Sequence, residues 1–156
     1  MRKMLLCIAA IAITGFTGLL PFNGTDVGKL HPVEVLAVSI ADEGITVVTD
    51  TGLRGIGETM EKAIENMKLT SAGEIFLETA NFLLVSEESI HLLDGVSVFL
   101  RPACQVYVFS GYGKWDNVAK YLESHPSNVT ILSYRQGMTN IPKLSVQDED
   151  YKIDRS

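Results

Sequence analysis

The chain has 156 residues and a net charge of −6 at pH 7. Without Arg2 and Lys3 it keeps 11 basic residues against 19 acidic ones, a net charge of −8, and every acidic residue lies after position 25. This balance argues against nucleic acid as a partner and against adhesion to anionic lipid by charge, because both require a basic surface. The length suits one domain of ordinary size.

The first 24 residues have the pattern of a membrane-targeting segment. Arg2 and Lys3 precede Met4–Phe22, a run of 19 residues without a charge. We expect a hydrophobic helix over residues 1–24 that is either a membrane anchor or a cleaved signal peptide. Its length is close to the span of a bilayer and no Ala-x-Ala site follows, which favours the anchor. The basic start stays in the cytoplasm, so the rest is expected on the extracytoplasmic side, membrane-attached or, after cleavage, secreted.

A linker over residues 25–32 and a single α/β domain over residues 33–134 are expected next. Val33–Ala41 is nearly all apolar, and Ile45–Thr51 is rich in Val and Thr. The turn signal Asp42-Glu43-Gly44 between them predicts a β-hairpin. The glycine-rich stretch Gly52–Gly57 fits neither the Rossmann nor the Walker pattern and is interpreted as a flexible connection to a helix.

Helical spacing of apolar residues predicts a helix over Glu58–Leu69. Ile75–Val85 contains a buried strand, and Ser86 is a plausible N-cap of a second helix that ends before Pro102. A strand over Gln105–Ser110 and a last helix that ends at His125-Pro126 follow.

The remainder of the chain holds one strand-like run, Val129–Tyr134, and a polar, acidic tail over residues 135–156. The predicted fold class is therefore α/β (α+β). We expect a mixed sheet of about four or five strands packed with about three helices, preceded by the N-terminal hydrophobic helix.

No pattern in the sequence is typical of catalysis or of metal binding. His31, His91 and His125 are far apart and none pairs with a cysteine, and a G-x-S-x-G elbow is absent. Cys104 is expected to be a small buried side chain in a strand. We therefore predict no catalytic residue, no metal and no cofactor.

Three residues are candidates for an interaction surface. Tyr112 is an aromatic residue in a Gly-Tyr-Gly turn, where it is expected to be exposed. Glu87 and Glu88 begin the helix that follows Ser86, where carboxylates suit the helix dipole.

Five stretches carry a family resemblance through their order along the chain: Pro32–Ile40 before an acidic turn, Gly55–Ala63 at a helix start, the apolar strand Phe82–Glu87, Leu92–Arg101, and Val106–Gly111 running into a turn. Together they resemble the N-terminal domain of the germinant-receptor C subunit family, Ger(x)C, of spore-forming bacteria. The resemblance covers about residues 33–125. The lipobox and later domains of that family have no counterpart in this sequence.

The resemblance implies a non-enzymatic interaction module, acting with membrane proteins of a germination or sporulation complex. It brings no catalytic residues with it. A secreted small-ligand-binding or enzymatic domain is the alternative function that the sequence leaves open.

Overall fold

The computed structural model describes residues 30–113, 117–148 and 150–154. The predicted N-terminal helix and most of the predicted linker lie outside these residues. Within them, no helix has the length and apolar character that crossing a membrane requires. The strands are β1 (Leu30–Pro32), β2 (Val35–Ala41), β3 (Gly44–Thr49), β4 (Arg54–Gly57), β5 (Glu74–Phe76), β6 (Phe82–Ser86), β7 (Gln105–Gly113), β8 (Lys143–Asp148) and β9 (Asp150–Asp154). The α-helices are α2 (Met60–Thr70), α3 (Leu93–Val96), α4 (Val118–Ser124) and α5 (Ile131–Arg135), and three 3-10 helices are η2 (Leu77–Thr79), η3 (Glu87–Leu92) and η4 (Ser97–Phe99).

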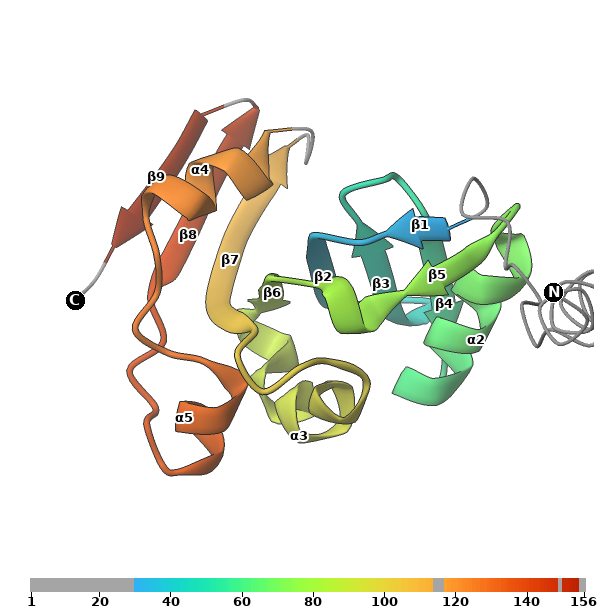
Figure 1. Cartoon of the computed structure of the whole chain (residues 1–156), viewed down its shortest axis with the longest axis horizontal. Coiled ribbons are helices and arrows are strands. Elements are labelled where there is room, and N and C mark those ends of the chain that lie inside the picture. Colours follow the sequence, from blue (N-terminus) through green and yellow to red (C-terminus); the bar gives the residue numbers. More distant parts are fainter. Residues whose placement is uncertain (1–29, 114–116, 149, 155–156) are drawn as a thin grey trace, which may run out of the picture.

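Seven strands form one mixed sheet in the order β4-β3-β2-β6-β7-β8-β9 (Figure 1). The four strands β2, β6, β7 and β8 are parallel, whereas β3, β4 and β9 run antiparallel to their neighbours. A separate parallel pair joins β1 to β5. The mixed α+β class is confirmed, and so is the predicted hairpin, which is the antiparallel pair of β2 and β3. The expected strand count of four or five was too low.

Three segments differ from the sequence-based prediction. The glycine-rich stretch is the edge strand β4 rather than a flexible connection. The last residues of the expected acidic tail form β8 and β9, so the sheet continues to residue 154. The strand-like run Val129–Tyr134 instead enters α5, which begins with a capping box between Thr130 and Ser133. That reciprocal pair satisfies the backbone N–H groups of Thr130 and Ser133 and outweighs the β propensity of the run.

Two clusters of buried side chains lie on opposite faces of the sheet, as the alternation along β6 and β7 shows. Leu83 and Val106 belong to the cluster that contains residues of α2, α3 and α5, and we call their side of the sheet the α2 face. Leu84 and Tyr107 pack with α4, and we call this side the α4 face. Apolar residues on both faces explain why β2 and β6 are nearly continuous apolar runs.

The helix connections leave the α4 face only partly covered. The connection from β6 to β7 packs α3 on the α2 face, whereas the connection from β7 to β8 packs α4 on the opposite face. The connection from β7 to β8 also contains α5, which packs on the α2 face. In Figure 1, α4 lies beside β8 and β9, while α2 lies at the far end of the sheet beside β4.

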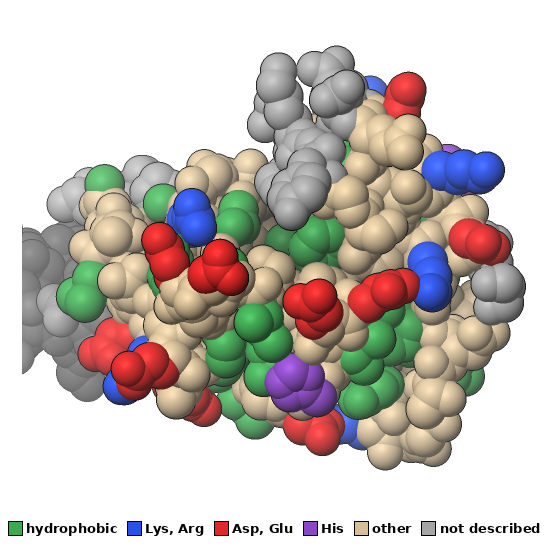
Figure 2. Space-filling model, turned by 180° about the vertical axis from the view of Figure 1, so that it is seen from behind, with side chains coloured by type: hydrophobic (Ala, Val, Ile, Leu, Met, Phe, Trp, Pro, Cys, Tyr) green, Lys and Arg blue, Asp and Glu red, His purple; other side chains and the backbone are tan. Residues whose placement is uncertain are grey.

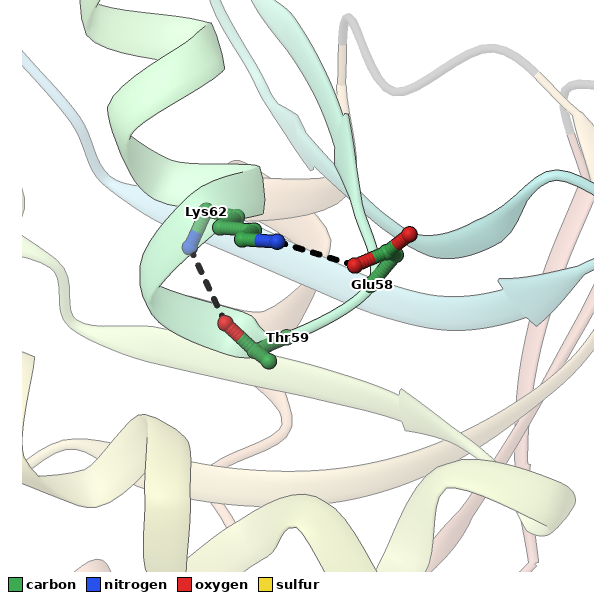
Figure 3. Close-up of polar contacts among 3 residues, drawn as sticks. All are labelled: Glu58, Thr59 and Lys62. Carbon is green, nitrogen blue, oxygen red and sulfur yellow. Dashed lines mark hydrogen bonds and ion pairs between the residues drawn. The ribbon is translucent and has the colours of Figure 1, made fainter.

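Helix α2 begins at an N-cap that the sequence supplies locally. The Thr59 hydroxyl accepts a hydrogen bond from the Lys62 backbone N–H, and Lys62 Nζ pairs with Glu58 at 2.8 Å (Figure 3). A side-chain cap of this kind satisfies one of the N–H groups that the first turn leaves open. The ion pair is exposed and adds little.

Two glycines let α2 lie directly on β4. A Cβ at Gly55 would come within 2.1 Å of the Ala63 carbonyl oxygen, and one at Gly57 within 2.5 Å of the Ala63 nitrogen. These contacts are with helix backbone, which cannot turn aside as a flexible side chain can. The glycines are therefore required by close packing, because no other residue fits between strand and helix.

We expect Gly55→Ala to destabilise the protein by about 2 kcal/mol or more, because the added methyl group forces α2 away from the sheet. Gly95→Ala is the matched control, since a Cβ at Gly95 in α3 meets no atom within 4 Å and alanine favours a helix over glycine. Urea unfolding of the full chain measures both. Equal stability of the two variants would contradict the close-packing role of Gly55.

A groove at the carboxyl ends of the parallel strands

A groove of about 590 Å³ lies on the α4 face, where the strands nearest β4 are not covered by α4. Its lining residues are Ala37, Ser39, Ile40, Ala41, Thr46, Val48, Arg54, Ser86, Glu87, Glu88, Phe109, Ser110 and Gly111. We call this site the sheet groove. Figure 2 shows the molecule from behind, where hydrophobic side chains are exposed between acidic ones.

Strand register assembles the floor of the sheet groove. Ser39 on β2 faces Thr46 on β3, and Ala37 faces Val48, which in turn faces Arg54 on β4. Ser86 at the end of β6 pairs with Phe109 on β7. The floor therefore crosses five adjacent strands near the carboxyl ends of β2, β6 and β7. This end of parallel strands is where open α/β sheets commonly bind ligands.

Most of the floor is made of small side chains. Ala37, Ser39 and Ala41 alternate along β2 toward the groove. Their short side chains leave space above the strand, while Val48 and Phe109 supply larger apolar walls on either side. The result is a concave, mostly apolar surface with a few polar groups, which is the usual composition of a small-molecule site.

Thr46 is the exceptional polar group of the groove. Its side chain is buried, with 5% of its surface exposed, and its Oγ1 has no hydrogen-bond partner among the described residues. The other buried polar side chains in the described part of the chain are Thr49, Ser89 and Ser97, and each has a partner. A buried hydroxyl without a partner is costly, and because Oγ1 is inaccessible to solvent it lies beneath the surface of the groove.

Charged groups stand at both sides of the groove. Glu87 pairs with Lys143 of β8 at 2.7 Å, and this hydrogen bond and the positive charge hold the pKa of the Glu87 carboxyl below its usual value. The pair connects the segment after β6 to β8. Arg54 and Glu88 have no ion-pair partner among the described residues, although both line the groove.

The sequence-predicted candidates lie in or near this region. Glu87 and Glu88 both line the sheet groove, although they open a 3-10 helix rather than an α-helix. Tyr112 lies in β7, and its backbone pairs with Gln147; its side chain is outside the described part of the structure. The predicted turn at this tyrosine is thus a continuing strand.

Sequence reasoning missed Ser39, Thr46 and Arg54. The period-2 alternation of β2 and β3 could have placed Ser39 and Thr46 on one face, because residues two apart on a strand share a side. Arg54 was hidden because its glycine-rich segment was interpreted as a loop. The absence of a partner for Thr46 depends on the register of β2 and β3 and on where α4 ends. Neither can be inferred from the local sequence.

Cys104 and His125, which the sequence analysis considered, both have packing roles in the structure. Cys104 is fully buried just before β7, and burial raises the pKa of its thiol to about 12, so it is not the reactive thiolate that catalysis requires. His125 stacks on Tyr121 with ring centroids 4.3 Å apart. No group of three or more His, Cys, Asp or Glu side chains in the described ranges could hold a metal ion.

Comparison with protein-family models found no match for this chain, and comparisons with curated proteins and with solved structures found none either. The resemblance to the Ger(x)C family therefore rests on the sequence stretches alone.

We expect Thr46→Val to stabilise the ligand-free protein by about 1 kcal/mol, because it removes an unpaired buried hydroxyl with little change of shape. Thr49→Val on the same strand is the matched control. The Thr49 hydroxyl bonds Thr51 Oγ1 at 2.8 Å and accepts from the Leu53 N–H at 3.1 Å, so its loss should destabilise by about 1 kcal/mol or more. Thermal unfolding measures both. A loss of stability in Thr46→Val as large as in the control would show that Thr46 is not unpaired.

Proposed function

We propose that this chain is a non-enzymatic binding module, membrane-attached on the extracytoplasmic side or exported, whose sheet groove receives a ligand. The observation that carries the proposal is the groove of about 590 Å³ at the carboxyl ends of the parallel strands, with small side chains of β2 along its floor. A groove of this volume is within the range of about 300–1,000 Å³ that small-molecule sites occupy. This proposal combines the small-ligand-binding alternative with the expected membrane attachment or export.

The charge state of the groove supports binding over acid–base catalysis. The ion pair with Lys143 favours the ionised form of Glu87. A carboxyl group that acts as a general acid near neutral pH needs the opposite shift, with a pKa raised toward the working pH. Glu87 is thus suited to holding Lys143 and shaping the wall of the groove.

Plugging the groove tests the binding proposal. A panel of metabolites and short peptides is screened against the full chain by thermal shift, since a ligand selective for the folded state raises the unfolding temperature. Ser39→Trp should abolish any shift, because the indole fills the floor. Ser145→Trp is the control; this half-buried serine of β8 does not line the groove. Shifts that persist unchanged in Ser39→Trp, or no shift with any compound, would contradict the proposal.

The proposal extends to spore formation or germination, in contact with membrane proteins. Its support is the ordered resemblance over residues 33–125, together with the apolar run Met4–Phe22 as the attachment.

Deleting the gene for this chain from a spore-forming host should lower sporulation or germination efficiency. Complementation with the unaltered chain should restore it, whereas the Ser39→Trp chain should not if the groove is used. Normal spore yield and normal germination in the deletion strain would contradict this part of the proposal.

A further inference from the structure

Strand β9 forms one edge of the sheet, and we propose that it is the interface through which two copies of this chain form a reversible dimer. In this dimer the β9 strands of the two copies pair antiparallel, so that the two sheets become one continuous sheet. The interface is separate from the sheet groove, whose lining includes no residue of β8 or β9.

The two edges of the sheet are closed to different degrees. At β4, side chains of α2 reach the backbone of the edge strand. Asn66 Oδ1 accepts a hydrogen bond from the Ile56 N–H at 3.2 Å. The Thr70 hydroxyl donates to the Arg54 carbonyl oxygen at 3.4 Å. At β9, the described residues supply strand pairing on one side only, from β8 (Figure 1). The N–H and C=O groups of a strand point to both of its sides, so β9 has a second side to which a further strand can pair.

Side chains along β9 alternate between an apolar face and a charged face. Tyr151 and Ile153 are half-buried and pack against the cluster of the α4 face. Asp150, Lys152 and Asp154 are exposed on the other face. A two-fold axis perpendicular to the sheet keeps each face continuous across the interface. Residues of the same face are therefore opposite each other in a β9–β9 pair, which limits the registers.

Charge complementarity chooses among these registers. With Lys152 opposite its own copy, like charges meet at the centre, and Asp150 meets Asp154 on either side; like charges directly opposite destabilise a strand pair. With Tyr151 opposite its own copy, Asp150 of each chain is opposite Lys152 of the other, which gives two attractive pairs. Exposed pairs add little attraction in water, so their role is to exclude the repulsive register.

A third register, centred on Ile153, is less favourable than the one centred on Tyr151. It would place Lys152 of each chain opposite Asp154 of the other, but Asp154 is already opposite Lys143 of β8. The β8 residues opposite Asp150 and Lys152 are uncharged.

Aromatic packing favours the Tyr151-centred register as well. The Tyr151 ring lies 5.4 Å from that of Tyr121 in α4, and Tyr121 stacks on His125. Directly opposite residues of two strands have Cβ atoms about 4.5–5.5 Å apart. The two Tyr151 side chains would thus be neighbours and would join the aromatic rows of both copies. Cross-strand aromatic pairs of this kind stabilise a sheet.

Sedimentation equilibrium of the full chain in detergent tests the dimer. A contact through one five-residue strand is smaller than a standard interface of roughly 1,200–2,000 Å², so the unaltered chain should associate reversibly as its concentration rises. Asp150→Lys should weaken dimerisation about tenfold or more, because it turns two attractive pairs into repulsive ones. Lys152→Asp should do the same, and the double exchange should restore the dimer. Glu61→Lys is the matched control, with the same change of charge at an exposed residue of α2.

Engineered cysteines locate the register, in chains that also carry Cys7→Ser. A mixture of Asp150→Cys and Lys152→Cys chains should form a disulfide-linked heterodimer on oxidation, because the two positions are directly opposite. Lys152→Cys alone should link poorly, because position 152 of the second copy lies diagonally at about 7–8 Å.

Three results would overturn the proposed interface. The first is a chain that stays monomeric at every soluble concentration, which would show that the charges of β9 guard this edge. The second is a dimer that Asp150→Lys leaves unchanged. The third is efficient self-linking of Lys152→Cys. None of them bears on ligand binding, because Ser39→Trp acts in the sheet groove, away from β9.

Discussion

The parallel pairing of β2, β6 and β7 is the constraint on which the rest of the structure depends. Backbone hydrogen bonds and apolar side chains on both faces hold these strands in the centre of the sheet. A strand in this position must be apolar on both sides. The groove lies where burial of both faces ends. There, all three strands change from buried apolar residues to serines: Ser39, Ser86 and Ser110.

Coverage of the two faces is unequal for a physical reason. On the α2 face, Gly55 and Gly57 let the 11-residue helix α2 approach the backbone of β4, so this face is covered as far as the edge strand. On the α4 face, α4 has seven residues and packs near β7 and β8. Tyr107 holds the end of this connection by donating a hydrogen bond from its hydroxyl to the His125 carbonyl at 2.9 Å. This bond ties the end of α4 to β7, on the side of the sheet away from β4.

Much of the fold could be predicted from periodicity, and the errors have identifiable causes. Strands β2, β6 and β7 could be predicted from their apolar runs, and α2 from the spacing of its apolar residues. Burial of these side chains dictates both patterns directly. β4 was missed because glycine is depleted in strands, although close packing requires it here. β8 and β9 were missed because polar residues alternate with apolar ones in a segment that is acidic as a whole. The helix at Ile131 was missed because a local cap outweighed β-branched residues.

The candidate site was predictable only in part. The carboxylates Glu87 and Glu88 could be noticed because they follow a buried strand, which places them at the sheet edge. Thr46 could not, because its sequence context, Ile45-Thr46-Val47-Val48, is that of an ordinary strand. Its position under the groove results from three non-local features: the register that pairs it with Ser39, its burial, and the end of α4 before β3.

The threonine at position 46 costs the fold stability at a point beneath the groove. Valine has nearly the same shape and equal β propensity, and it would remove the cost of an unpaired buried hydroxyl. Elsewhere in the described core, each buried hydroxyl has a partner, as Ser89 has in Ser86 at 2.7 Å. Folded proteins depart from such local rules mainly where function requires it. The Thr46 hydroxyl is such a departure, and it lies directly beneath the floor of the groove.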